Sequence, residues 1–377
     1  MYFSRINLQN WKNFKSVETS LQMRVFVIGP NASGKSNLLD AFRFLRDVAM
    51  DGLEKAVDAR GGVSTVRCLS ASRYSDILVE VDVTDPGIDV WQYRLVFNQD
   101  QQRRVTVKSE IVRRNGAELL GRPDAQDQRD PVRLSQTALQ QIAANQDFRE
   151  LADFFKSISY QHLLPQAVRD PRGFSPLPVP NDPYGRDLLL RLWQTPAKTR
   201  DARLRKISGA LRIAVPQLTE LKAVMDDAGT PHLEGGYSHW RPQAARQNES
   251  QFSDGTLRLL GLLWTAFDGA GPLLLEEPEI SLHPEIVRRL PAVLDRMNRE
   301  RKAPRQTIIS THSEDLLSDP SIGSEEVLRL EPSPEGTVFA PTEEADRQAL
   351  LAGLTVADVL MPKAAPQGVE QLALEFG

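Results

Sequence analysis

The stretch that most constrains this chain lies at residues 25–36, where the apolar run VFVI meets the glycine-framed loop GPNASGKS. Gly29 and Gly34 allow the backbone to curl so that successive N–H groups point inward toward an anion. The apolar run predicts a strand, and the apolar spacing over residues 36–50 predicts a helix whose N-terminus adds partial positive charge. The spacing G-x-x-x-x-G-K-S therefore predicts a phosphate-binding loop between a strand and a helix.

The side chains of this loop suit a nucleotide with a bound magnesium ion. Lys35 supplies a point charge for the β- and γ-phosphates, and the Ser36 hydroxyl is a hard oxygen ligand of the kind that Mg²⁺ prefers. The residues expected to bind the nucleotide are Gly29, Pro30, Asn31, Ala32, Ser33, Gly34, Lys35, Ser36 and Asn37. The alternative is a chance match in a turn, and the flanking strand and helix argue against it.

Composition excludes several classes of function. The 377 residues carry 46 Lys and Arg against 50 Asp and Glu, so the net charge of −4 gives no global positive field for nucleic acid. DNA contact would need a local basic patch. The single Cys68 excludes an internal disulfide, and His and Cys are too sparse for a structural zinc site. No leader sequence is evident, and the longest apolar stretch, 257–267, is too short to span a bilayer. We expect a soluble cytoplasmic protein with no membrane partner.

The remaining pattern predicts how the chain is divided. Strand-like runs at 77–83, 90–97 and 104–112, separated by turn residues, predict an antiparallel meander. Residues 133–160 and 184–213 have helical spacing on either side of the proline-rich segment 165–183. We therefore expect a nucleotide-binding lobe over 1–118, a mostly helical insertion over 119–250, the second part of the lobe over 251–345 and a C-terminal tail over 346–377.

Three segments after the expected insertion carry further candidate site residues. Residues 252–257, FSDGTL, open an apolar helix that reaches about residue 267. The run LLLEEPE at 273–279 is a buried type of strand that ends in Glu276 and Glu277. A second such strand, QTIISTHS at 306–313, ends near His312. Short apolar runs with polar ends are typical of parallel strands that present ligand groups at their carboxyl ends.

Taken in this order, the phosphate loop, the SDGT stretch, LLLEEPE and STHS resemble the motifs of ATP-binding-cassette ATPases of the SMC, RecF and OLD branch, which are often called AAA-type ATP-binding proteins. The resemblance covers the N-terminal third and the region from about 250 to 330. It implies an α/β fold of the P-loop NTPase type, with a mixed sheet, an antiparallel β subdomain and a helical insertion. It also implies ATP and Mg²⁺ as ligands.

The resemblance further implies a role for each candidate residue. Ser253, Asp254 and Gly255 would belong to a signature motif that faces the γ-phosphate held by a second subunit. Glu276 would join Ser36 at Mg²⁺. Glu277 would position or deprotonate the attacking water.

His312 would contact the γ-phosphate beside Lys35, and residues 281–283 would couple the two sites of a dimer. Two features depart from the family pattern. Glu276 stands where Asp is usual, and the glutamine of the family's glutamine loop stays open between Gln92, Gln161 and Gln166. The SDGT stretch also has the composition of a helix N-cap, and His283 with Pro284 has that of a helix start.

Together these roles predict a switch. ATP would join two copies head to tail, and hydrolysis would release them. This cycle would control a separately encoded effector, such as a nuclease, in bacterial defence against phage. Roughly sixty residues follow His312, too few for a nuclease domain of the Toprim type. A RecF-like role in DNA repair is the near alternative.

Two further alternatives belong to other classes of function. A P-loop small-molecule kinase would not need residues 253–256, and a scaffold would bind nucleotide without hydrolysing it. The basic run Arg296 to Arg305 could contact DNA, but interleaved acidic residues favour a solvated helix face.

Overall fold

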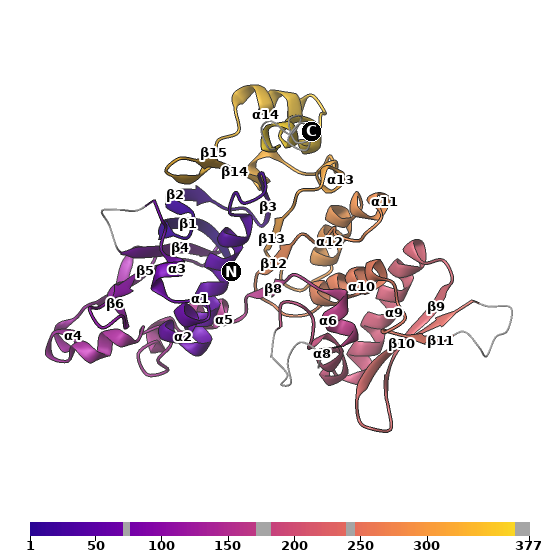
Figure 1. The fold of residues 1–377 in the computed structure, drawn as a ribbon, viewed down its shortest axis with the longest axis horizontal. Helices are drawn as coiled ribbons and strands as arrows, with labels where there is room; N and C mark the ends of the chain where they lie inside the picture. The colour runs from indigo at the N-terminus through magenta and orange to yellow at the C-terminus, as the bar shows by residue number, and fades with distance from the viewer. Residues whose placement is uncertain (71–75, 171–181, 239–245, 366–377) are drawn as a thin grey trace, which may run out of the picture. The chain divides into compact units, whose positions relative to one another are not determined.

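The structure is a computed structural model that describes residues 1–70, 76–170, 182–238 and 246–365. The chain forms two compact units, and Figure 1 shows their elements by label. The first unit comprises Met1–Ile158, Ala270–Leu274 and Arg305–Gly377, and the second comprises Ser159–Gly269 and Leu275–Pro304. The second unit is thus inserted in the sequence of the first, with a short return of the chain over 270–274.

The first unit contains a six-stranded antiparallel sheet in the order β2-β1-β4-β5-β6-β7. Its strands are β1 (Tyr2–Trp11), β2 (Phe14–Ser20), β4 (Ile77–Asp85), β5 (Asp89–Gln99), β6 (Val105–Arg114) and β7 (Ala117–Arg122). Ile77 pairs with Phe97 and Trp91 pairs with Arg114, so β4, β5 and β6 form the antiparallel meander that the turn residues predicted.

A second, mixed sheet carries the phosphate loop. In the first unit its strands β15 (Gly336–Ala340), β14 (Val327–Ser333), β3 (Arg24–Ile28) and β13 (Thr307–Ser310) follow this order, with β12 (Leu273–Glu276) next to β13. Strand β3 is parallel to both β13 and β14. Both of its faces are covered, because Val25 to Ile28 are at most 1% exposed. This burial explains the continuous apolar run before the loop.

Helix α1 (Lys35–Asp51) packs in the core of the first unit. Its Phe42 lies against Phe3 of β1 with ring centroids 4.7 Å apart, and its Phe44 lies 5.0 Å from Trp11. The other helices of this unit are α2 (Leu53–Asp58), α3 (Val63–Val66), α4 (Ala125–Arg129), α5 (Arg149–Lys156), α13 (Glu314–Leu317), α14 (Glu344–Leu351), α15 (Val356–Val359) and α16 (Met361–Ala364), with short 3₁₀ turns at Pro131–Ser135, Gln146–Phe148 and Ser324–Glu326.

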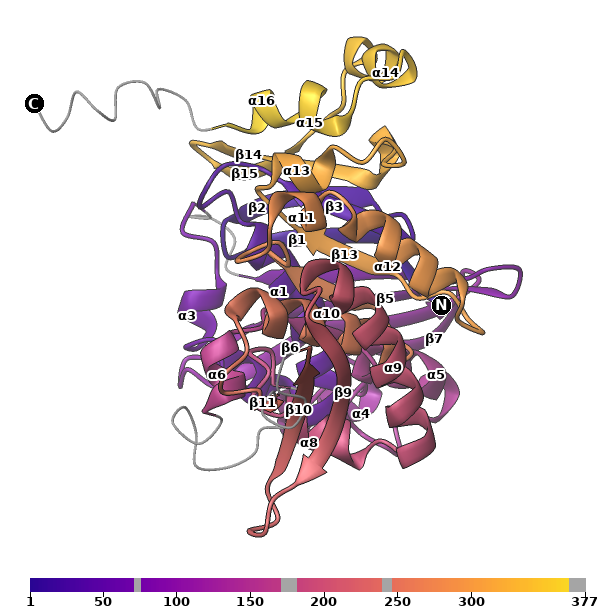
Figure 2. The same cartoon turned by 90° about the vertical axis from the view of Figure 1, so that its right-hand side faces the viewer.

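The second unit combines helices with a small sheet. Its elements are β8 (Ser159–Gln161), α6 (Pro165–Arg169), α8 (Leu188–Gln194), α9 (Ala197–Ala214), β9 (Leu218–Met225), β10 (Pro231–Tyr237), β11 (Arg246–Asn248), α10 (Asp254–Phe267), α11 (Pro284–Val287) and α12 (Leu290–Arg299). The three-stranded sheet has the order β11-β10-β9, and Figure 2 shows β9 and β10 beside α9.

The expected helix over 133–160 is wrong over most of its length. The backbone N–H groups of Ala138 and Leu139 donate to the Glu110 carboxylate at 2.6 and 3.0 Å, so they do not serve a helix, and α5 begins only at Arg149. The helix over 184–213 is divided, because Thr195 and Pro196 have extended backbone between α8 and α9. Pro291 lies in the first turn of α12, where its missing N–H costs little, and does not kink a longer helix.

The expected insertion over 119–250 is less helical than proposed. Residues 218–248 contain β9 to β11, and on β10 the buried Leu233 and Gly235 are separated by the more exposed Glu234, which reflects the two-residue period of a strand. Most of the proline-rich segment, part of the polar linker at 241–251 and the end of the tail lie outside the described residues. Along the stretches that the structure describes, every helix is too short or too polar to cross a membrane.

Candidate functional site

The phosphate loop follows β3 directly and ends at the first residue of α1. Gly34 is the N-cap of α1 in the left-handed conformation, with φ +97°, and offers no side chain to the helix N–H groups. The Lys35 ammonium donates to the carbonyl oxygens of Gly29 at 2.9 Å and Pro30 at 3.0 Å. The Lys35 side chain therefore folds back over the phosphate loop. The backbone N–H groups at the start of α1 have no side-chain cap and can donate to an anion.

Asn13, in the turn between β1 and β2, links the phosphate loop to neighbouring segments through side-chain hydrogen bonds. Its amide nitrogen donates to the Ser33 carbonyl at 3.0 Å and to the Thr337 hydroxyl at 2.7 Å, while its oxygen accepts from Asn37 at 2.8 Å. A Cβ on Gly34 would lie 2.1 Å from this amide, so residue 34 must be glycine for Asn13 to approach. The sequence reading missed Asn13, since a single Asn in a turn gives no signal of a contact so distant in the chain.

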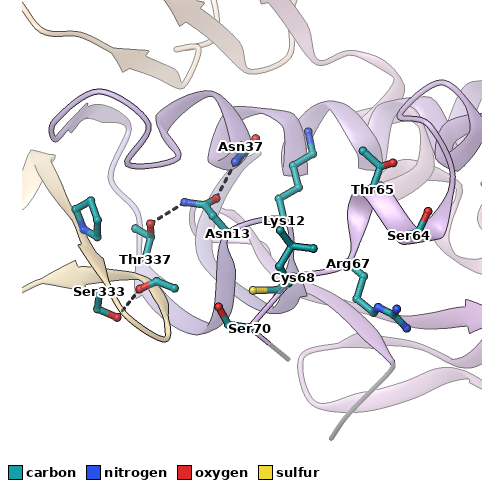
Figure 3. A pocket seen from close by; sticks show the side chains of 13 residues that line it. Lys12, Asn13, Asn37, Ser64, Thr65, Arg67, Cys68, Ser70, Ser333 and Thr337 are labelled. Carbon is teal, nitrogen blue, oxygen red and sulfur yellow. Dashed lines mark hydrogen bonds between the residues drawn. The ribbon is translucent and has the colours of Figure 1, made fainter. Parts of the chain in front are cut away.

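A cavity of about 750 Å³ lies beside the start of α1 (Figure 3). Lys12, Asn13, Asn37, Arg67 and Thr337 are among its lining residues. Asp40 is also near, and Lys12 pairs with it at 2.6 Å. Burial opposes the charge on Asp40, but Arg60 and Lys12 together lower the pKa of its carboxyl. The cavity thus has two cationic side chains in its lining, Lys12 and Arg67, and the pair with Asp40 holds Lys12 in place.

His312 follows the end of β13, two residues beyond Ser310. Ser310 is level with Val27 in the parallel ladder, and Thr311 N–H donates to the Val27 carbonyl at 3.1 Å. Since Gly29 is two residues beyond Val27, His312 and the phosphate loop leave the same edge of the sheet on neighbouring strands. The predicted placement of His312 at the carboxyl end of a parallel strand is therefore observed in the first unit.

The SDGT stretch begins α10 in the second unit. Ser253 is the N-cap, and its hydroxyl accepts from Thr256 N–H at 3.2 Å. Arg169 of α6 pairs with Asp254 at 2.6 Å and donates to the Phe252 carbonyl at 2.6 Å. Ser253 and Asp254 remain exposed. The stretch is thus a helix cap, as the pattern indicated, and Arg169 braces it in a way that sequence reasoning did not detect.

The start of α10 touches the loop that follows the two glutamates. A Cβ on Gly255 would lie 2.7 Å from the Ser281 carbonyl oxygen. Ser281 and Glu277 both have left-handed backbone, with φ of 63° and 45°. Residues with side chains adopt this conformation rarely, and such outliers are common at functional sites. The sharp turn after β12 thus brings the 277–283 loop against the SDGT stretch.

Glu276 at the end of β12 lies beside β8. Its carboxylate accepts a hydrogen bond from the Tyr160 hydroxyl, and its carbonyl lies 3.3 Å from His162 Nδ1. Gln161, between these two residues, lines a small cavity together with Glu276 and Arg258. Its amide is buried and has no hydrogen-bond partner in the described part of the chain. Gln161 thus lies next to Glu276, a candidate site residue of the second unit.

The other two glutamines lie on other elements. Gln92 accepts from Arg113 on the antiparallel sheet, and Gln166 is in the short helix α6. Arg258 on α10 is buried, which lowers the pKa of its guanidinium, while the charges of Asp254, Glu277 and Glu279 act in the opposite direction. A cation is therefore held among the carboxylates that follow β12.

Several basic side chains of the run at 296–305 bind other groups of the protein itself. Arg305 is only 2% exposed and donates to the Gly271 carbonyl, and Arg301 donates to the Ala266 carbonyl at 3.0 Å. Arg299 pairs with Asp295 at 2.5 Å. These contacts favour the solvated and structural interpretation over a phosphate-binding face.

The phosphate loop at the end of a central parallel strand, the neighbouring strand that ends at His312, and the antiparallel sheet are features of a P-loop nucleotide-binding fold of the ABC type. Residues 24–319 match the family described as AAA domain, putative AbiEii toxin, Type IV TA system. Since the match covers most of the chain, the chain belongs to this family. Its P-loop implies use of a nucleotide, typically with Mg²⁺.

Solved structures of SMC heads have a similar fold. An SMC head bound to the C-winged helix domain of ScpA is 15% identical, with a TM-score of 0.55, and covers 93% of this chain and 100% of its own. The head domain with an extended coiled coil from Pyrococcus furiosus, bound to the C-terminal domain of ScpA, is 12% identical with a TM-score of 0.52, covering 93% and 98%. That of Pyrococcus yayanosii is 11% identical with a TM-score of 0.51, covering 93% and 99%. At these identities the likeness concerns the fold alone. A search of curated proteins found no match.

Proposed function

We propose that this protein is an ATP-hydrolysing switch in which two copies close around ATP and control a separately encoded effector, such as a nuclease, in bacterial defence against phage. The observation that carries the proposal is the phosphate loop, with Lys35 across its mouth and the uncapped start of α1 beneath. The exposed Ser253 at the start of α10 supports the dimer, because it is accessible to a second copy.

The residues that would perform hydrolysis follow from their chemistry. Lys35 would exchange its two carbonyl partners for phosphate oxygens. The Ser36 hydroxyl and the Glu276 carboxylate are hard oxygen donors and fit Mg²⁺, which would neutralise charge on the β- and γ-phosphates. Glu277 would orient the attacking water, and His312 would contact the γ-phosphate.

Positions outside the predicted motifs would complete the site. We assign the base and ribose of the nucleotide to the cavity lined by Asn13 and Arg67, since it adjoins the start of α1 (Figure 3). Gln161 is our candidate for the glutamine loop, because its buried amide lies near Glu276. It would sense whether the phosphate and metal positions are filled.

The family description supports a role in defence, since it names a putative toxin of a toxin–antitoxin system. A RecF-like role in DNA repair is the alternative, and the SMC-like fold favours it as a second candidate. Both roles use the same ATP-dependent association and differ in the partner.

The Ser253→Arg variant tests the proposal against a monomeric kinase or a scaffold. A long cation at the exposed cap would block the partner's phosphate site, so both ATP-dependent association and ATP hydrolysis should be lost. The Ser16→Arg variant is the control, since Ser16 is an exposed serine on β2. A Ser253→Arg protein that hydrolyses ATP at the wild-type rate would refute the shared site.

A further inference from the structure

Helix α9 is strongly basic in a chain that is acidic overall. Its sequence AKTRDARLRKISGALRIA carries six basic side chains and one acidic side chain, against a net charge of −4 for the whole protein. The helix packs on β9 and on α10 through apolar residues such as Leu204, Ile207 and Leu211. Its basic side chains lie around these apolar contacts, and Figure 2 shows α9 and β9 running side by side.

A groove of about 460 Å³ lies between α9 and β9. Its cationic lining residues are Arg200, Arg205 and Arg212 of the helix and Lys222 of the strand. Asp201 and Glu220 also line it, so cations outnumber anions two to one. At a rise of 1.5 Å per residue, the arginines from 200 to 212 extend over about 18 Å.

The charges of this groove differ in how far they are already engaged. Arg200 stacks on Trp193 with its guanidinium 4.5 Å from the ring centroid, and Arg212 donates to the Thr219 carbonyl. Lys222 pairs with its neighbour Glu220 at 2.8 Å. Arg205 is exposed and makes no ion pair or hydrogen bond within the described ranges of the chain. Arg205 is thus the cation most available to a ligand.

The lining of the groove includes a buried hydroxyl group that makes no hydrogen bond among the described residues. Ser208, one turn beyond Arg205 on the same face of α9, is only 4% exposed. Its hydroxyl has no hydrogen-bond partner among the described residues. A buried hydroxyl without a partner costs free energy, and an oxygen-rich ligand in the groove would satisfy it.

We propose that the groove between α9 and β9 binds the phosphodiester backbone of duplex nucleic acid. Arg205, Arg212 and Lys222 would contact successive phosphates, and the Ser208 hydroxyl would donate to a phosphate oxygen. One strand of a duplex carries a phosphate about every 3.4 Å, so 18 Å spans roughly five of them. Guanidinium groups match phosphate oxygens well, and arginine supplies three of the four cations here.

The lining argues against a single-stranded nucleic acid and against an acidic protein. No aromatic side chain lines the groove along the described chain, so it offers no platform on which bases could stack. Its apolar members are only Leu221, Ala223 and Val224, which leaves no pocket for the large anchor residue typical of a protein interface. A regular row of phosphates fits this arrangement better, and binding should not depend on sequence.

The test is fluorescence anisotropy of a short labelled DNA duplex with the full chain, without nucleotide, between about 50 and 200 mM salt. Three phosphate contacts predict a slope of log K against log salt of about −2.7. The Arg205→Gln variant should reduce the magnitude of this slope by about 0.9 and weaken binding about tenfold at 0.1 M salt. The Ser208→Ala variant should weaken binding with no change in slope, since it removes no charge.

The Arg296→Gln variant is the matched control, because it removes one arginine that is 85% exposed on α12 of the same unit. Its slope should equal that of the wild type. Equal losses for Arg205→Gln and Arg296→Gln would overturn the proposal, because binding would then follow net charge. Binding of polyglutamate without binding of DNA would assign the groove to an acidic protein and would also overturn it. Since no nucleotide is present, neither result depends on the ATPase proposal.

Discussion

Replacing Gly255 with alanine probes the contact that joins the SDGT stretch to the loop after the two glutamates. The new Cβ would lie 2.7 Å from the Ser281 carbonyl oxygen, closer than any ordinary contact of carbon and oxygen. The start of α10 or the 277–283 loop must therefore move. Gly209 offers a matched control, since it is also a helical glycine of the second unit and its Cβ would meet nothing within 4 Å.

The two variants should differ in the sign of their effect on stability. Alanine in place of glycine within a helix gains up to about 1 kcal/mol, and the Gly209→Ala variant should show this gain. At Gly255 the overlap with backbone should cost about 1–3 kcal/mol, as overpacking does in a core. We therefore expect the free energy of unfolding of Gly255→Ala to lie about 1–3 kcal/mol below that of Gly209→Ala.

Urea unfolding of both variants, followed by tryptophan fluorescence, measures this difference, because Trp264 is buried on α10. ATP turnover measured on the same samples should fall for Gly255→Ala and stay near wild type for Gly209→Ala. Equal free energies of unfolding for the two variants would show that residues 255 and 281 can move apart without loss of stability. Full turnover in Gly255→Ala would refute the inference that this contact positions the 277–283 loop.

Three further predictions concern buried charge, pH and the phosphate loop. The Arg122→Met variant should lose about 3–5 kcal/mol in urea unfolding, because Arg122 pairs with two fully buried carboxylates, Glu110 at 3.2 Å and Asp127 at 2.9 Å, and its removal leaves Asp127 only the longer pair with Arg133 at 3.6 Å. Both ring nitrogens of His232 contact carboxylates, and the hydrogen bond that His232 donates to Glu249 is the largest cause that raises the pKa of the imidazole. The stabilisation should therefore be complete below the unfolded pKa of about 6.5 and be lost as pH rises through the raised value, which the urea midpoint between pH 6 and 9 measures. The Asn13→Ala variant removes three hydrogen bonds around the loop, and calorimetry should show at least tenfold weaker ATP binding.

Each of these predictions has its own control. Arg104→Met breaks an exposed pair with Asp100 and should cost less than about 1 kcal/mol. His232→Gln should flatten the pH dependence, and an unchanged pH profile in that variant would assign it to other groups. Asn115→Ala removes a turn asparagine of the antiparallel sheet and should leave ATP affinity unchanged. Equal ATP affinity in Asn13→Ala would show that the loop holds its shape without the Asn13 bridge.

The phosphate loop, the strands beside it and the cap at Ser253 were predictable, because local chemistry alone determines them. Buried parallel strands need continuous apolar runs, and a glycine-framed loop must follow where the backbone curls. The meander was predictable for the same reason, since alternation and turn residues are local signals.

The errors arise where distant residues compete with local preference. The segment after Gln136 has helical composition, but the buried Glu110 carboxylate takes the N–H groups of Ala138 and Leu139. The bracing of the SDGT stretch by Arg169 and of the loop by Asn13 depends on contacts between segments far apart in the chain. A single sequence carries no signal for such contacts. The choice among the three glutamines likewise needed the position of β8 beside β12.

The measurement that tests the central claim most directly is the mass in solution of the Glu277→Gln protein, by light scattering, with and without Mg-ATP. Removing the carboxylate that positions water should stall hydrolysis and leave ATP bound. The account predicts a shift from the 42.2 kDa of one chain to twice that mass when Mg-ATP is added. An unchanged mass of one chain, with ATP demonstrably bound, would contradict it and would mean that the SDGT stretch is only a helix cap.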